Sequence, residues 1–236
     1  MANLRSVTKL LTEFATICTE KQFANLCATD SSYLDKEYVY LSTIQIRGEL
    51  CGGVITGILP SNSIAIIPQK CSAAYLAFLL TSFPCQYLLF EGKINTKDKV
   101  KVTKKSISKL FAFEVDKSTE KAYELAETVK AQTFQVYLEN KSDLNYHHLY
   151  YIVADLCNIL ALELYTNPMF EEMGISILEN WKSLIVEYEK TGNVQILFDG
   201  LIKSNSSLRN QIMKFHIFEN NFDKHIKNKA NGLEDK

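Results

Sequence analysis

The stretch SIAIIPQKCSAAYLAFLLTSFPCQYLLF, residues 63–90, decides the fold class because it places a strand directly before a buried helix. Its first six residues are rich in isoleucine and end at Pro68, which predicts a short strand. Residues 73–90 form a long apolar run, which predicts a buried helix interrupted near Pro84, whose ring removes a backbone donor. A strand and a helix in direct succession indicate a mixed α and β unit.

Further strand signals flank this stretch. Residues 37–46, EYVYLSTIQI, are rich in β-branched and aromatic residues and partly alternate, which predicts a strand. Short strands are also expected at 54–55 and at 110–115, the second of which closes the unit. Residues 4–14 have apolar residues at a helical spacing, which is equally compatible with a short turn into a strand.

The rest of the sequence has the pattern of helices. A long helix is expected from Ser118 to about Asn140, followed by helices at 143–166, 167–190, 194–203 and 206–225. We therefore predict the α+β class, with a mixed α/β domain at 1–117, a connecting helix at 118–141 and a small all-helical domain at 142–236. The C-terminal tail, KNKANGLEDK, is expected to fray.

The connecting helix carries one stripe of small and apolar residues at spacings of 4, 3, 4 and 3. Small side chains on such a stripe allow a second helix to approach closely, so the stripe is a candidate partner surface, including for a homodimer. Packing on the domain's own body explains the pattern equally well. The stripe consists of Ala122, Ala126, Val129, Thr133 and Val136.

Composition excludes several classes of protein. With 47% hydrophobic and 22% charged residues, the chain of 236 residues is neither disordered nor fibrous. Its longest apolar run, 73–90, contains polar residues and a proline, so it is a poor membrane span. The first residues lack the apolar core of a secretion signal, and the six cysteines form no CxxC pair. We expect a reduced, cytoplasmic protein with no membrane contact.

Motifs for catalysis and cofactor binding are missing from the sequence. It has no GxSxG, no GxxxxGK[ST], no GxGxxG and no adenine-methyltransferase signature. His147 and His148 are adjacent, so on a helix they point about 100° apart, which does not suit joint metal binding. We expect a non-catalytic chain without metal or cofactor, and an enzyme with an unrecognised motif stays open as a third alternative.

A lysine-rich segment, KINTKDKVKVTKKSISK at 93–109, stands out from the rest of the sequence. It has seven lysines against the single acid Asp98, together with short hydroxyl side chains. Lysines neutralise phosphates and hydroxyls fix register, so the mixture suits a DNA backbone. A lysine-protected edge strand explains it equally well. Residues 1–115 hold 13 Lys+Arg against 9 Asp+Glu, whereas the remainder is net acidic, which leaves room for a basic face on the first half.

The order of features in residues 1–138 resembles the target-recognition unit of type I restriction–modification specificity subunits. The resemblance rests on TKLLTEFATICTEK, on YVYLSTIQI, on the stretch 63–90, on EGKINTKDKVKVTKKSISKLFAFEV and on the long helix after it. Two departures are visible. The chain reads VDKSTEKAYEL where the family usually has proline and a Glu-Gln pair, and it holds one copy of a unit that the family repeats.

The resemblance implies a DNA-reading module that brings a DNA methyltransferase subunit to double-stranded DNA at a particular sequence, with a restriction subunit as an open further partner. The module itself contributes no catalysis. Arg47 and Gln45 are the candidates for reading base edges, with ordinary strand surface as their alternative. The candidates for phosphate contact are Lys97, Lys99, Lys101, Thr103, Lys104 and Lys105.

A protein-interaction module without DNA binding is the second hypothesis. In this case the helical half docks a partner and the first half is a scaffold with a target-recognition-like fold. Aromatic residues would anchor the partner, although packing inside a helical bundle explains them as well. They are Tyr146, Tyr150, Tyr151, Tyr165 and Trp181.

Overall fold

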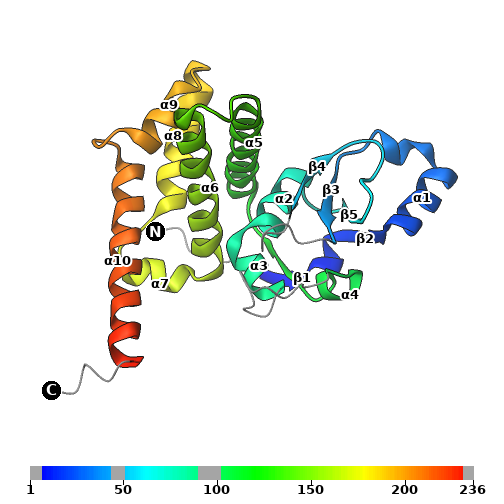
Figure 1. The fold of residues 1–236 in the computed structure, drawn as a ribbon, viewed down its shortest axis with the longest axis horizontal. Coiled ribbons are helices and arrows are strands. Elements are labelled where there is room, and N and C mark those ends of the chain that lie inside the picture. Colours follow the sequence, from blue (N-terminus) through cyan, green and yellow to red (C-terminus); the bar gives the residue numbers. More distant parts are fainter. Residues whose placement is uncertain (1–6, 44–50, 90–101, 231–236) are drawn as a thin grey trace. The chain divides into compact units, whose positions relative to one another are not determined.

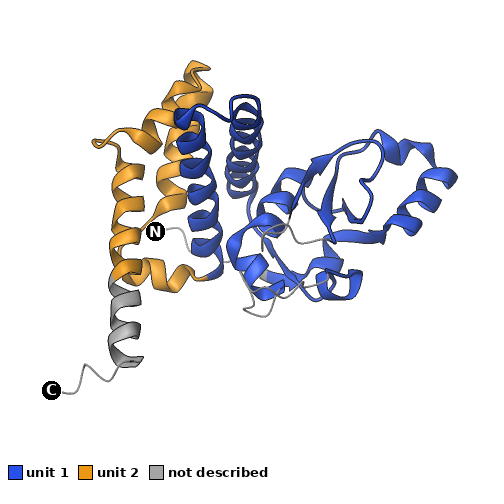
Figure 2. Ribbon diagram, viewed as in Figure 1, with its two compact units in different colours: residues 1–165 blue, residues 166–236 orange. Residues whose placement is uncertain are grey.

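The computed structural model describes residues 7–43, 51–89 and 102–230, with side chains up to Asn220. The chain forms two compact units, which divide between Tyr165 and Thr166 (Figure 2). Helix α6 (Leu144–Tyr165) belongs to the first unit because it packs along α5 (Lys117–Glu139). The boundary between the two units therefore lies later in the chain than either boundary of the predicted division into 1–117, 118–141 and 142–236.

The first unit is built on a four-stranded antiparallel sheet with the strand order β2-β5-β3-β4 (Figure 1). A separate antiparallel pair joins β1 to β6. Together with the helices, these sheets confirm the predicted α+β class. The strands are β1 (Val7–Leu10), β2 (Ala15–Thr19), β3 (Tyr38–Ser42), β4 (Gly52–Ile55), β5 (Ser63–Pro68) and β6 (Phe111–Glu114).

The sequence predicts some of these strands closely. Strand β5 has the predicted bounds, whereas β3 ends at Ser42 within the longer predicted strand 37–46. The ambiguous residues 4–14 form β1 and then a short 3-10 helix, η1 (Leu11–Glu13), in the part that the structure describes. Phe14 O accepts from Gln69 N at 2.8 Å, which joins this turn to the end of β5.

Helices cover both faces of the four-stranded sheet. Side chains alternate between the faces along a strand, so Tyr38 and Ala65 share one face while Val39 and Ile66 share the other. On the first face α1 (Glu20–Thr29) packs Phe23 against Tyr38, with ring centroids 4.6 Å apart. On the second face lies α2 (Ala73–Thr81), which is buried along most of its length. The remaining short helix of this region is η2 (Ser31–Leu34).

The predicted helix 73–90 is two helices. The break falls at Ser82, whose backbone is extended (ψ 151°), and Pro84 then lies in the first turn of α3 (Phe83–Leu89). Proline is favoured in a first turn because its missing N–H would have no partner there. The prediction of an interruption is therefore right, but the interruption precedes the proline by two residues.

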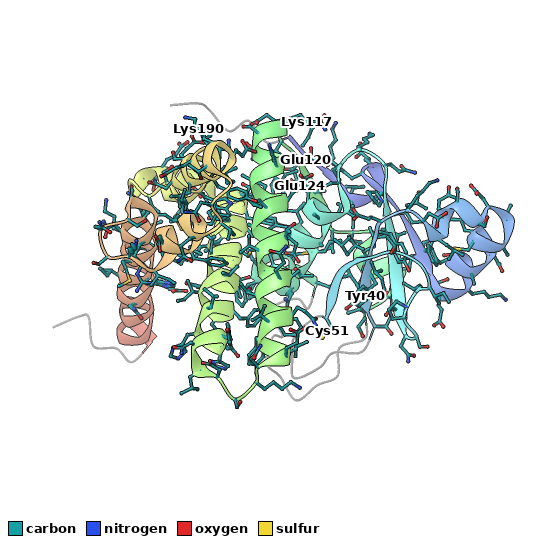
Figure 3. All side chains as sticks on the ribbon, turned by 90° about the horizontal axis from the view of Figure 1, so that it is seen from above. Tyr40, Cys51, Lys117, Glu120, Glu124 and Lys190 are labelled. Carbon is teal, nitrogen blue, oxygen red and sulfur yellow. The ribbon has the colours of Figure 1, made fainter. Side chains whose placement is uncertain are left out.

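Helix α5 is fixed to the sheet domain at its first turns, where Figure 3 labels Lys117, Glu120 and Glu124. Glu120 Oε1 accepts from Ser72 N at 2.9 Å, which ties α5 to the start of α2. Tyr123 stacks on Phe78, with ring centroids 4.6 Å apart. The helix hairpin of α5 and α6 is thus part of the same packed body as the sheet.

The second unit is all helical. Its helix α8 (Ile177–Thr191) is followed by Gly192, which caps it with the left-handed backbone (φ 67°) that favours glycine. The single helix predicted at 167–190 is wrong, because Gly174 also has a positive φ (62°) and separates two helices. The helices are α7 (Asn167–Glu172), α8 (Ile177–Thr191), α9 (Gln195–Ile202) and α10 (Ser207–Ala230).

Gly52, at the start of β4, directly follows Cys51, which Figure 3 labels, and has no room for a side chain. A Cβ at this position would lie 2.7 Å from Tyr40 O and 2.5 Å from Leu41 Cδ2. We expect Gly52→Ala to lower the free energy of unfolding by about 1–3 kcal/mol, because the backbone oxygen cannot move aside without shifting β3. Urea unfolding followed by far-UV circular dichroism measures this change.

Gly53 provides the control for that substitution. A Cβ there meets only Tyr40 Cε1, at an ordinary contact distance of 3.6 Å. Gly53→Ala should therefore leave the urea midpoint unchanged or raise it slightly, since alanine loses less backbone entropy on folding than glycine. Equal losses in both variants would contradict the steric explanation.

Candidate nucleic-acid interface

A short helix, α4 (Lys104–Ile107), carries the part of the lysine-rich segment that the structure describes. Thr103 caps it: Ser106 N donates to Thr103 Oγ1 at 3.1 Å, and Thr103 N donates to Ser106 Oγ at 2.9 Å. Ile107 is fully buried and Val102 nearly so, which fixes the turn to the body of the unit. The Thr103 hydroxyl is therefore engaged in shaping the turn that presents the lysines.

The lysines of this turn differ in their surroundings. Lys104 is half-buried and donates from Nζ to Gln22 Oε1 at 3.0 Å, across to the first turn of α1. Lys105 and Lys109 are exposed, and neither is paired with a carboxylate among the described residues. The ammonium groups of Lys105 on α4 and of Lys109, two residues after the end of α4, are thus available to an anionic ligand such as a phosphate backbone.

Several strand ends meet at the same end of the sheet as this turn. Thr19 at the end of β2 is in register with Ile64, and Ser42 at the end of β3 is in register with Ser63. Lys104 contacts this end of the sheet because its ammonium donates to Gln22, which lies three residues after Thr19. The lysine turn and the C-terminal ends of two strands are therefore neighbours, although they are far apart in the sequence.

Hydrogen bonds connect the loops at this end of the sheet. Thr43 donates from N and from Oγ1 to Asn62 O, at 2.7 and 2.8 Å. Asn62 has a left-handed backbone (φ 57°), as its place in the turn predicts, and its N–H donates to Glu20 Oε2 at 3.3 Å. Thr43, the turn at Asn62 and the start of α1 thus form one connected edge.

Most of the predicted DNA contacts lie outside the described residues. These are Gln45 and Arg47 in the segment 44–50, and Lys97, Lys99 and Lys101 in the segment 90–101. Thr43, which precedes the first segment, belongs to the connected edge, and Val102, which follows the second segment, directly precedes Thr103, the cap of α4. Of the predicted contacts, the structure describes Thr103, Lys104 and Lys105.

A pocket of about 310 Å³ opens beside α4. Its lining includes the exposed Lys105 and Lys109 together with the largely buried Leu89 and Leu110. The two exposed lysines therefore line a hollow of mixed polar and apolar character.

The titratable group beneath this surface is the Cys18 thiol of β2. Burial raises the pKa of Cys18 above its ordinary value of 9.0, and the positive charge of Lys104 acts in the opposite direction. The thiol is therefore protonated at neutral pH, which makes it a poor nucleophile. The positive charge of this face therefore comes from its lysines.

The prediction that the small-residue stripe on α5 is a partner surface is wrong, because most of the stripe is buried. Ala122 and Ala126 are fully buried, Val129 and Thr133 are 3% and 5% exposed, and only Val136 is 37% exposed. Helices α2 and α6 of the same unit pack against α5, which is the second explanation that the sequence left open. A second copy of the chain cannot reach four of the five residues without opening the first unit.

The predicted aromatic anchors have mixed positions. Trp181 is fully buried in the second unit, and burial raises the pKa of Tyr165 above its ordinary value of 10.0. Tyr146 and Tyr151 are 37% and 56% exposed, near the turn between α5 and α6. Tyr150 forms ring contacts with Tyr137 and Phe134 in the same region. Three of the five anchors therefore gather at one end of the helix hairpin.

Sequence reasoning did not name Lys109 or Gln22 among the candidate contacts. Lys109 lies in the lysine-rich segment, whereas Gln22 lies far from it in the sequence. The pattern Thr-x-x-Gln at 19–22 is a recognisable helix-capping signal, and the capping box is present in the structure. Its contact with Lys104, 82 residues further along, depends on the tertiary fold. The local signal was therefore readable, but the link to the lysine turn was not.

Among the described residues, no group of three or more histidine, cysteine, aspartate or glutamate side chains has an arrangement that could hold a metal ion. Within residues 7–43, 51–89 and 102–230, none of the helices combines the length and apolar character that crossing a bilayer requires. Comparison of the chain with protein-family models, with curated proteins and with solved structures finds no match.

Proposed function

We propose that this chain is a sequence-specific DNA recognition module of a restriction–modification system, which directs a methyltransferase partner to its site. The observation that carries the proposal is the position of α4. Its Lys104 contacts Gln22 on the helical turn of Glu20, at the end of the sheet where Thr43, Asn62 and Glu20 connect the loops. Phosphate-binding and base-reading groups need such proximity, because a duplex presents both within one groove width.

The division of labour in this surface follows from the burial of its side chains. Lys105 and Lys109 are exposed, so they are free to neutralise phosphates and release counterions. Thr103 acts as a positioning residue, since its hydroxyl is held in the cap of α4. The loops at the sheet end supply the polar side chains for base edges, and the partner subunit supplies the chemistry.

The test is a titration of mixed-sequence duplex DNA at several salt concentrations with the Lys105→Ala/Lys109→Ala variant beside the parent. Each lysine that neutralises a phosphate contributes roughly 0.9 to the slope of log K against log salt. We expect the parent to show steep salt dependence and the variant to lose about 2 in slope. Fluorescence anisotropy of a labelled duplex gives both quantities.

The control is the Lys190→Ala/Lys214→Ala variant, which makes the same change in net charge on the second unit. Both lysines are exposed, and Lys190 is labelled in Figure 3. This variant should keep the parent's slope. A parent that binds no duplex even at low salt contradicts the proposal, as do equal losses in both variants.

Docking of a protein partner is the second candidate, and one observation favours it. Leu144, Tyr151 and Phe134 are 71%, 56% and 40% exposed around the turn between α5 and α6. Exposed aromatic and aliphatic side chains in one region are typical of protein interfaces. A salt-independent failure of the parent to bind DNA in the titration above would favour this function over DNA recognition.

A further inference from the structure

The side-chain amide of Gln22 has a fixed orientation. Its Oε1 accepts from Thr19 N at 3.1 Å and from Lys104 Nζ at 3.0 Å. Both partners are obligate donors, so a flipped amide would turn its own NH2 group toward two other donors. Gln22 therefore keeps Nε2 directed away from the cap of α1.

This orientation restricts what Gln22 can recognise. The two hydrogen bonds occupy both lone pairs of Oε1, and among the described residues Nε2 has no acceptor. The paired contact of a glutamine with adenine requires the amide oxygen as an acceptor and the nitrogen as a donor. Gln22 lacks the free acceptor, so it offers hydrogen-bond donors alone.

Lys104 adds donors beside Gln22. Its ammonium has three N–H groups, of which the contact with Gln22 uses one. The side chain is half-buried, and its helix is anchored by the fully buried Ile107. A lysine held in this manner loses less conformational freedom on binding than a fully exposed one.

We propose that Gln22 and Lys104 together read the O6 and N7 atoms of a guanine in the major groove, an inference that rests on the proposed DNA-recognition function. Guanine is the base that presents two acceptors side by side in that groove, whereas adenine presents one acceptor and one donor. Glu20 lies in the same helical turn as Gln22, and its carboxylate repels a phosphate more strongly than an uncharged base edge.

Gln22→Glu is the sharpest variant because it preserves the structural role of Gln22. A glutamate three residues after Thr19 completes the same capping box, and its carboxylate still accepts from Lys104. The change removes the Nε2 donors and adds one negative charge, and it leaves the two hydrogen bonds accepted at this position in place. Asn25→Asp is the matched control, since it converts an exposed amide to a carboxylate one turn later on the same helix.

The experiment selects bound duplexes from a random-sequence library, with the parent, Gln22→Glu and Asn25→Asp in parallel. We expect the parent and Asn25→Asp to enrich the same sequences. Gln22→Glu should lose the preference for one G·C pair, with affinity for the parent's site reduced roughly five- to hundredfold. Anisotropy titrations of the enriched site and of the same site with that pair replaced measure the change.

The outcomes separate this inference from the proposed function. If Gln22→Glu enriches the parent's consensus unchanged, or weakens every sequence equally, the guanine contact is wrong while DNA recognition stands. If the lost preference is for an A·T pair, the donor-only assignment of Gln22 is wrong. If the parent enriches no sequence, the proposed function fails before Gln22 is tested.

Discussion

Replacing Lys130 by methionine is expected to lower the free energy of unfolding of the first unit by about 3–5 kcal/mol. Lys130 on α5 forms an ion pair with Glu127 and donates to Thr81 Oγ1 of α2 at 2.9 Å. The two charged side chains are only 17% and 7% exposed. Methionine fills a similar volume but leaves the Glu127 carboxylate buried without its cation, which is the costly half of such a pair.

A double variant, Lys130→Met/Glu127→Met, isolates the cause. Removing both charges replaces the pair by apolar groups of similar size, so most of the lost stability should return. Thr81 keeps a partner, since its hydroxyl also donates to Ala77 O at 2.8 Å. Urea unfolding followed by far-UV circular dichroism measures all three proteins. A double variant as unstable as the single one would show that packing, and not the ion pair, is responsible.

The pH dependence of this effect has a definite sign. Burial lowers the pKa of Lys130, but the Glu127 carboxylate, together with Cys157 and Tyr150, raises it, and the net result is a pKa above the ordinary 10.5. A lysine whose pKa is higher in the folded state contributes stability that is fully present below 10.5 and is lost as pH rises through the folded value. The gap between parent and Lys130→Met should therefore be constant around neutral pH and narrow in strong alkali.

The sequence predicts those parts of the fold that local chemistry determines. Strand β5 is correct because isoleucines favour strands and Pro68 ends the run. The helix from Ser118 to about Asn140 corresponds to α5, and Asp116 caps it through Ser118 N at 2.9 Å and Thr119 N at 3.0 Å. Both features depend on residues that are near one another in the chain.

Predictions fail where the answer lies in a distant segment. The periodicity of Ala122 and Ala126 indicates that a face of α5 is covered, but it carries no information about which helix covers it. In the fold α2 and α6 supply the cover, so the stripe belongs to the interior. Gly174 shows a second reason for failure. The Asn-Pro start and the later Gly192 predict one continuous helix, and neither signal reveals that Gly174 between them takes a left-handed backbone.

The candidate interface also has a part that the sequence predicts and a part that depends on the fold. The lysine-rich composition of 93–109 indicates an anion-binding surface without any structure. Which lysines are free depends on burial: Lys104 is held by Gln22, whereas Lys105 and Lys109 are exposed. From the sequence, Lys104 and Lys105 are predicted as equivalent phosphate contacts, but in the fold they have different neighbours.

Trp181→Ala is the second substitution with a large expected effect, and it acts on the second unit. Trp181 is the only tryptophan of the chain and is fully buried in α8. Truncating a buried tryptophan to alanine costs about 3–5 kcal/mol through lost burial and the cavity left behind. A helical unit of this size has a total stability of only about 4–10 kcal/mol, so much of it would be lost.

Hydrogen exchange measured by mass spectrometry locates that loss along the chain. Amides of α7, α8 and α9 should exchange much faster in Trp181→Ala than in the parent, while those of β2, β3 and β5 should keep their protection. Trp181→Phe, which keeps most of the buried ring, should fall between the two. Faster exchange throughout the chain would contradict the assignment of Trp181 to a separately packed unit.

The Trp181→Ala variant also tests which of the two units binds DNA. The lysines and loop contacts of the proposed interface all belong to residues before Tyr165, and the second unit contributes none of them. If recognition resides in the first unit, Trp181→Ala binds duplex DNA with the parent's salt slope even where its last helices exchange freely. A slope that falls with the loss of α8 would assign part of the phosphate contact to the second unit and contradict this placement of the interface.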